Sequence, residues 1–445
     1  MEKSWQQKAM GLAAGLVVIA VGILLVIKPR QSLDTLAVII SVGILVMAVI
    51  NGVGAFINRH KSNTGQVLET VVELAAAAIL FYFRWDLGGW IPLVFAVWTL
   101  FNAVAILVSA FNYFKDGAPN YGAYFVIGII TLLLGLFLLA NHYANILAFG
   151  IVAGIYIIWY GITILFDTFN EERTQLAMSA AAKKMQRKLR IAIPSIVGAL
   201  LPRKLLKDYD DKIASEDANA FLQSQNITVA EKKTLNPFNV EILIHLSKKF
   251  MESFGHVDLI LGDEAISYGN FDGHSYRLGG AISDGVLFRC NRERYLYQST
   301  HHDEKVLYAF KVAFSDEELK QIARNFERMK ENMVPWYCDT QLAEQGLLPE
   351  GDYDDVADVI YKGNQAAFYK FTKGTLRTYF AVDTNCVKVA DSIFEGTGFD
   401  KPAIPGIVTP GAYYEFLMHE LEAPGTKVYE RVLYAKETIT EEPVI

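Results

Sequence analysis

Cysteine is scarce in this sequence of 445 residues. Only Cys290, Cys338 and Cys386 occur, all in the second half, widely spaced and without a Cys-x-x-Cys pair. An odd number of widely spaced cysteines supports neither a disulfide framework nor a cysteine zinc site. The sequence therefore fits a reducing compartment, and each thiol has to be judged by its own surroundings.

An excess of positive charge is also lacking. The chain has 41 Lys and Arg against 48 Asp and Glu, a formal net charge of −7. That balance excludes the overall basic footprint typical of nucleic-acid binding. No nucleotide-binding glycine fingerprint is present, since Gly279-Gly280 indicates only a turn, and His301-His302-Asp303 indicates a solvated loop rather than a metal site. We therefore expect no cofactor, no metal and no nucleic-acid partner.

Long apolar runs, in contrast, fill the first part of the chain. Six runs, joined by short connections, are long enough or nearly so to span a bilayer: residues 9–27, 34–57, 67–83, 90–111, 123–140 and 146–166. The first is too long for a signal-peptide core and has no clear small-residue cleavage site, so we interpret it as a retained anchor. Residues 1–170 are thus predicted to form a six-helix transmembrane bundle in contact with the lipid bilayer.

The distribution of Lys and Arg predicts how this bundle is oriented. If the N-terminus is inside, the cytoplasmic flanks carry nine basic residues and the other side carries only Lys28, Arg30 and Arg84. Basic residues accumulate on the cytoplasmic side of membrane proteins. We therefore expect a multi-pass protein of the bacterial inner (plasma) membrane with both termini in the cytoplasm.

The membrane part also contains an internal repeat. Gly15 and Gly22 recur as Gly128 and Gly135 with the same spacing of seven, and glycines spaced in this way allow close helix contact. With Pro29 closing the first helix, the runs GLVVIAVGILLVIKP and GIITLLLGLFLLANH resemble the HdeD family of bacterial membrane proteins over residues 8–167. The resemblance implies six short helices in hairpins and an association with acid resistance, and it carries no catalytic residue over to this chain.

Polar residues are few within these spans. Glu69 and Glu73 lie one helical turn apart at the cytoplasmic end of the third run. They are either a proton-responsive pair or acids tolerated at a helix N-terminus at headgroup level. So few polar groups argue against a transport pathway, and self-association of the membrane helices into a homo-oligomer is left open.

Residues 171–235 are predicted to be a linker. Lys183, Lys184, Arg187 and Lys188 share one helical face, and the apolar stretch 191–201 that follows is too short to span a bilayer. A basic helix followed by a short apolar segment is typical of a chain lying on an anionic leaflet. A solvated connector helix is the alternative.

The last part, residues 236–445, is predicted to be a cytoplasmic α+β domain. Segment 238–253 has the apolar face of a helix, which would make His245 a surface or capping residue. Two β-like runs flank Gly262-Asp263 and indicate a hairpin, and segment 294–299 indicates a further strand. A capping box opens a predicted helix over residues 315–329.

The strongest candidate for chemistry is Cys386, within the stretch YFAVDTNCVKVADSIFEG. A strand-like run ends there, a helix-period segment follows, and either Asp383 or Thr384 can cap that helix. Cys386 then lies in the first turn, where free amide groups and the helix dipole favour the thiolate. Papain-like enzymes present their nucleophile in this way. The alternative is that Cys386 is simply a small buried apolar residue.

The second candidate is His256, at the start of the first strand of the predicted hairpin. Tyr268, Gly269 or Asn270 comes opposite it, depending on the register of the turn. A histidine on an early strand followed by a cysteine at a late helix start is papain chemistry in circularly permuted order.

These motifs resemble a known group of enzymes over residues 245–435. HVDLILGDEAISYG resembles the H-x-x-x-Y-x-G-D-G hairpin of the lecithin:retinol acyltransferase group and of YiiX-type permuted papain-like hydrolases, and the tripeptide TNC resembles their nucleophile site. The resemblance implies that Cys386 is the nucleophile and His256 the base. It leaves the third, orienting residue open between Tyr268 and Asn270, with His274 in reserve.

The sequence therefore predicts a membrane-anchored cysteine hydrolase or acyltransferase acting at the cytoplasmic leaflet. Its substrate would be an amide, ester or thioester, and lipid, peptide and small-molecule acyl compounds all remain candidates. Two other interpretations stay open. One is a non-enzymatic membrane stress or acid-resistance protein whose papain-like domain binds a partner, and the other is a peptidase regulated by its membrane helices.

Overall fold

A computed structural model describes residues 5–57, 74–75, 82, 87–169, 201–215, 218–229, 238–247, 255–381, 386–399, 409–422 and 426–442. The chain divides into two compact units. The first comprises Met1–Val104 and Ile129–Glu171, and the second comprises Ala105–Gly128 and Glu172–Ile445. The boundary passes through two long helices, so that the tip of their hairpin belongs to the second unit.

Five helices of the described part are long and apolar enough to cross a membrane. They are α1 (Trp5–Ile27), α2 (Pro29–Ile57), α4 (Leu87–Lys115), α5 (Tyr121–Ala140) and α6 (His142–Phe169). The predicted transmembrane character of the first part is confirmed at this level. The third predicted span, with Glu69 and Glu73, lies almost wholly outside the described residues, so the count of six spans stays a prediction.

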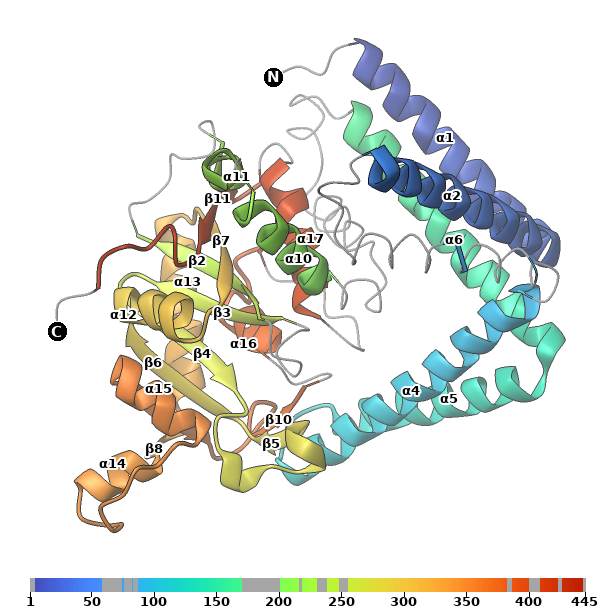
Figure 1. Ribbon diagram of the computed structural model, residues 1–445. Helices are drawn as coiled ribbons and strands as arrows, with labels where there is room; N and C mark the ends of the chain where they lie inside the picture. Colours follow the sequence, from blue (N-terminus) through green and yellow to red (C-terminus); the bar gives the residue numbers. More distant parts are fainter. Residues whose placement is uncertain are drawn as a thin grey trace. The chain divides into compact units, whose positions relative to one another are not determined.

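In the first unit, α1 packs along α6 through glycines on both helices (Figure 1). A Cβ atom added to Gly22 would lie 2.7 Å from the main-chain oxygen of Gly154, and one added to Gly154 would lie 2.7 Å from that of Gly22. Gly15 and Gly161 form a second pair, in which a Cβ on Gly161 would lie 2.8 Å from the oxygen of Gly15. The two backbones therefore approach more closely than any side chain would allow.

The later glycines of the repeat pack against a different neighbour. A Cβ atom on Gly128 would lie 2.7 Å from Leu107, and one on Gly135 would lie 2.6 Å from Leu100, both on α4. The glycine spacing is therefore repeated in α1 and α5, and in both helices it allows close contact with a neighbouring helix, α6 for α1 and α4 for α5.

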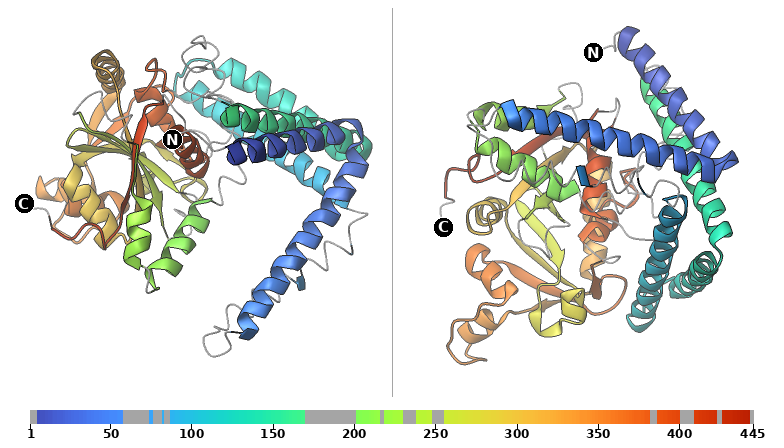
Figure 2. Two further views of the ribbon diagram at one scale, coloured as in Figure 1. Left: turned by 90° about the horizontal axis from the view of Figure 1, so that it is seen from above. Right: turned by 45° about the vertical axis from the view of Figure 1, so that its right-hand side comes forward.

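The second unit is built on a nine-stranded antiparallel sheet with the order β1-β11-β7-β2-β3-β4-β6-β9-β8, and a two-stranded sheet pairs β10 with β5. The strands are β1 (Ile227–Thr228), β2 (Val240–Leu246), β3 (His256–Leu261), β4 (Glu264–Gly269), β5 (Ile282–Asp284), β6 (Val286–Asn291), β7 (Val306–Val312), β8 (Met333–Trp336), β9 (Ala367–Phe371), β10 (Thr378–Phe380) and β11 (Val428–Tyr434). Figure 2 shows these strands from two further directions.

Helices cover both faces of the large sheet because its central strands are apolar on both sides. Along β7, Tyr308 and Phe310 join one core cluster, whereas the alternate residues Leu307 and Ala309 join the other. The first cluster includes residues of α10 (Leu201–Ile213), α13 (Asp316–Lys330), α16 (Cys386–Ile393) and α17 (Pro410–Glu422), and the second includes residues of α12 (Arg292–Tyr297) and α15 (Val356–Asn364).

Part of the predicted linker packs against this sheet. Helix α10 buries Leu206 and Tyr209 in the first core cluster, and β1, which follows α11 (Ala218–Gln225), pairs with β11. The described residues of 201–229 therefore contribute to the second unit. The basic residues 183–188 lie outside the described residues.

Two predictions of local structure are wrong, whereas the predicted hairpin of β3 and β4 and the predicted capping box are confirmed. Residues 240–246, predicted as helix, form the strand β2, because a short, mostly apolar strand that is buried on both faces cannot be told from a buried helix by its pattern. Segment 294–299, predicted as a strand, is helical in α12 and the π-helix η5 (Gln298–His302), and the Asn291 side chain caps α12 by accepting from the amides of Glu293 and Arg294. The predicted capping box at Ser315 does begin α13.

Candidate functional site

Cys386 is the first residue of α16, and its sulfur lies against the start of β3. The main-chain N–H of Val257 donates to Sγ at 3.3 Å. This amide is free for the thiol because the pairing of β3 with β4 covers only residues 259–261. Cys386 is 4% exposed. The caps predicted for this helix, Asp383 and Thr384, lie outside the described residues.

His256, the first residue of β3, connects Cys386 to a buried carboxylate. Its Nε2 lies 2.9 Å from Oδ1 of Asp258 and 3.1 Å from the hydroxyl of Ser267. Side chains two apart on a strand share a face, which places His256 and Asp258 together. The Cys386 side chain is also close enough to the imidazole of His256 to raise its pKa. The structure therefore brings Cys386 and His256 together, with Asp258 behind the histidine.

The electrostatics of this cluster favour a charged His256. Burial disfavours the imidazolium, but the carboxylate of Asp258 and the Cys386 thiol outweigh it, and the pKa of His256 lies well above its usual value. Burial likewise opposes the ionised form of Asp258, but the two neighbouring histidines hold its pKa well below the usual value. An opposite charge a few ångströms away stabilises the charged form of each partner.

Two further side chains reach the same carboxylate. His245 of β2 places its Nε2 2.7 Å from Oδ2 of Asp258, and the hydroxyl of Tyr295 from α12 donates to that oxygen as well. The register pairs His245 with His256 across β2 and β3. The prediction of a surface position for His245 is therefore wrong, because it followed from the incorrect helix.

The two residues predicted to orient His256 make their contacts elsewhere. The Tyr268 hydroxyl donates to the main-chain oxygen of Leu376 at 2.8 Å, and burial raises the pKa of Tyr268 well above its usual value. The Asn270 amide donates to the main-chain oxygen of Gly280 at 3.0 Å. The carboxylate that lies beside the imidazole of His256 is that of Asp258. The alternation His256-x-Asp258 on a strand was a signal in the sequence that could have identified it.

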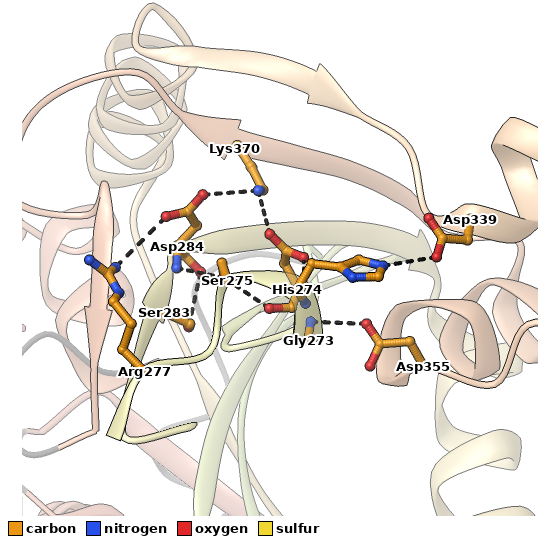
Figure 3. A network of polar contacts seen from close by, with 10 residues as sticks. Gly273, His274, Ser275, Arg277, Ser283, Asp284, Asp339, Asp355 and Lys370 are labelled. Carbon is orange, nitrogen blue, oxygen red and sulfur yellow. Dashed lines mark hydrogen bonds and ion pairs between the residues drawn. The ribbon is translucent and has the colours of Figure 1, made fainter. Parts of the chain in front are cut away.

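A polar network fixes the loop that follows Asn270 (Figure 3). Lys370 of β9 lies 2.5 Å from Asp272 and 3.0 Å from Asp284, and thereby joins both ends of the loop to the sheet. His274, considered as a reserve candidate, is 74% exposed and pairs with Asp339 at 2.9 Å. The network therefore belongs to the framework of the loop.

The other two cysteines lie in different surroundings. Burial raises the pKa of the Cys290 thiol well above its usual value and that of Cys338 to about 12. All three cysteines are free. Among the described residues, no group of three or more His, Cys, Asp or Glu side chains could hold a metal ion.

The tip of the α4–α5 hairpin, residues 105–128, packs within the second unit beside α16. Lys388, on the first turn of α16, donates to the Tyr113 hydroxyl, and its Nζ lies 4.9 Å from the centre of that ring. The main-chain oxygen of Asp116 accepts from the amide of Gly374 at 2.8 Å, and its buried carboxylate lies 3.5 Å from Arg377. Within the second unit, the helix that carries Cys386 thus contacts Tyr113 of this tip.

Comparison with known proteins identifies only the membrane part. Residues 13–82 and 126–180 match the family described as a short repeat of unknown function (DUF308). This is the repeat of the HdeD-like family, so the resemblance of the N-terminal half is confirmed at that level. The two matches begin 113 residues apart, the same distance that separates Gly15 from Gly128. No curated protein and no solved structure matches the chain.

Proposed function

We propose that the protein is a membrane-anchored cysteine hydrolase or acyltransferase that uses Cys386 and His256, with Asp258 orienting the histidine. The observation that carries this proposal is the contact series Cys386–His256–Asp258, which starts at the first residue of a helix and ends on a wholly buried carboxylate. A nucleophile beside a base that is itself oriented by a third group is the arrangement required for covalent catalysis. The order of histidine before cysteine, on an antiparallel sheet covered by helices, supports a permuted papain-like domain.

The proposed reaction has two half-reactions. With the proton of the Cys386 thiol already on His256, the thiolate sulfur forms a bond to the carbonyl carbon of an amide, ester or thioester. The bond to the leaving group then breaks as the imidazolium of His256 gives the proton to it, which leaves an acyl thioester on Cys386. Water or another acceptor attacks this thioester, with His256 again as the base, and the free thiol is restored.

The proposed location is the cytoplasmic face of the bacterial inner membrane. The support is the contact of Lys388 with Tyr113 at the α4–α5 tip, since the Lys and Arg distribution places that tip and the C-terminal domain on the same, cytoplasmic side. Activity of a C-terminal reporter that works only in the periplasm would contradict this orientation.

A thiol-directed acyl probe tests the proposal on the full-length protein. We expect covalent labelling of the wild type, retention of label in Cys290→Ala and Cys338→Ala, and loss of label in Cys386→Ala. Equal labelling of the wild type and Cys386→Ala would rule out the nucleophile.

One observation favours the alternative in which the C-terminal domain binds a partner without chemistry. Cys386 is only 4% exposed, and a covered thiol is also what a small buried apolar residue would give. In that case none of the four proteins would take the label, although the domain would be folded.

A further inference from the structure

Each oxygen of the carboxylate behind His256 lies within ion-pair distance of a histidine, and among the described residues only Oδ2 also accepts a hydrogen bond. Oδ1 of Asp258 faces Nε2 of His256 at 2.9 Å, while Oδ2 faces Nε2 of His245 at 2.7 Å and also accepts from the hydroxyl of Tyr295. The Asp258 side chain has no exposed surface. Its orientation is therefore set by these protein groups.

The two histidines on this carboxylate are not equivalent. Their rings lie edge to face, with centroids 5.5 Å apart, and their side chains are 3% exposed in His245 and 24% in His256. Two imidazolium ions this close would repel each other, and one carboxylate balances only one of them. Burial outweighs the attraction of Asp258 at His245 and lowers its pKa, whereas the pKa of His256 is raised. The charge therefore resides on His256.

A neutral His245 has one proton, and the geometry shows where it is. The short contact of Nε2 with an ionised carboxylate requires the proton on Nε2. Its Nδ1 is buried and has no hydrogen-bond partner among the described residues, as expected for a bare lone pair. His245 is thus a fixed, uncharged donor, and Tyr295 is a second one.

We infer that His245 and Tyr295 are positioning residues for the Cys386–His256 pair. By donating to Oδ2, they turn Oδ1 of Asp258 toward His256 and keep the carboxylate ionised. This inference rests on the proposed function, since it assigns the groups that act through Asp258 on the same site.

Other titratable groups face this cluster from several elements. Cys386 of α16 acts on His256, Lys305 before β7 acts on His245, and Cys290 of β6 and Asp303 act on Tyr295. None of these is changed in the variants below, so a change in the pH profile reports the donors to Asp258.

The test is the rate at which iodoacetamide alkylates Cys386 in the full-length protein, followed by mass spectrometry across a range of pH. His245→Leu and Tyr295→Phe each remove one donor, while His245→Gln keeps an N–H near the position of Nε2. Tyr308→Phe is the matched control, because it removes another inner hydroxyl, which donates to Gln225 instead.

We expect alkylation at neutral pH to slow about tenfold in His245→Leu and in Tyr295→Phe, as for the loss of a hydrogen bond to a charged group. The step of the pH profile at which His256 loses its proton should move to lower pH. His245→Gln and Tyr308→Phe should retain the wild-type rate and profile. Rates and profiles in His245→Leu and Tyr295→Phe that equal those of the wild type would overturn the inference.

Two internal readouts keep the outcomes distinct. Faster alkylation of Cys290 and Cys338 than in the wild type shows that a variant is unfolded. The result is then taken from the variant that lacks the other donor. His256→Ala tests the pair itself. If it leaves the Cys386 rate unchanged, the proposed function fails. If it slows the rate but the donor variants do not, only the positioning roles fail.

Discussion

In the first unit, α1 and α6 contact each other through glycines, which have no side chain. In the second unit, α16 and β3 carry the side chains of Cys386 and His256 where they meet. Gly22 and Gly154 bring two backbones so close that a single methyl group would not fit. Cys386 instead lies close to His256, whose imidazole contacts the fully buried carboxylate of Asp258. The contact between α1 and α6 should therefore be sensitive to added side-chain volume, whereas the site of Cys386 and His256 should be sensitive to the loss of a charged group.

The largest effect is expected in the second unit. His256→Ala removes the base and proton donor, and general acid–base groups contribute about 10²–10⁴-fold to rates. Turnover of an acyl substrate should fall by that amount, while circular dichroism of the full-length protein stays unchanged, because His256 lies at the first position of its strand. An unfolded variant would instead make His256 a structural residue.

Asp258→Asn should change the pH dependence as well as the rate. The pKa of His256 is raised in the folded protein, so the stabilisation from this pair is fully present below its usual value of 6.5 and is lost as the pH rises through the folded value. The lowered pKa of Asp258 adds stability above 3.8 that is lost as the pH falls through its folded value.

Without the carboxylate, the high-pH limit of activity should move to lower pH, and the free energy of unfolding should fall by about 1–3 kcal/mol. Measurements of the reaction rate and of the free energy of unfolding across a range of pH test these two expectations. A profile identical to that of the wild type would show that Asp258 does not act on His256.

Gly22→Ala should destabilise the first unit by about 1–3 kcal/mol, the usual cost of forcing extra volume into a packed contact. Gly43→Ala on α2 is the matched control, since its Cβ would meet nothing within 4 Å among the described residues. There the substitution should be neutral or stabilise by about 0.4–1 kcal/mol. Thermal unfolding in detergent compares the two, and equal midpoints would contradict the close approach of α1 and α6.

Tyr268→Phe should have the smallest effect. It removes one hydrogen bond to the main-chain oxygen of Leu376 and should reduce the free energy of unfolding by about 0.5–1.5 kcal/mol. The reactivity of Cys386 should stay at the wild-type level, because the hydroxyl of Tyr268 points to Leu376 rather than to His256. A strong loss of reactivity with unchanged stability would restore Tyr268 to the chemistry.

The sequence predicts the parts of this fold that depend on local signals. Hydropathy identifies the apolar helices, the repeated glycines identify a repeat that the family match supports, and Gly262-Asp263 identifies the turn between β3 and β4. Cys386 at a helix start and His256 at a strand start also follow from local patterns.

The rest depends on contacts between segments far apart in the chain. β2 is a strand because β3 and β7 pair with it on either side, and only that pairing brings His245 to Asp258. Tyr295 reaches the same carboxylate from α12, a helix whose residues carry a strand-like pattern. The two-residue period of a strand places Asp258 on the same face as His256, whereas the hairpin register predicts a partner on the opposite strand.

The most direct test of the central claim compares the alkylation rates of the three cysteines in the folded protein at neutral pH, before and after His256→Ala. Cys386 has an imidazolium partner and an amide donor, whereas burial raises the pKa of Cys290 and Cys338. The account predicts that Cys386 reacts fastest in the wild type and loses this advantage in His256→Ala, and that all three react alike in denaturant. Equal rates for the three cysteines in the folded wild type, or a Cys386 rate that does not depend on His256, would contradict it.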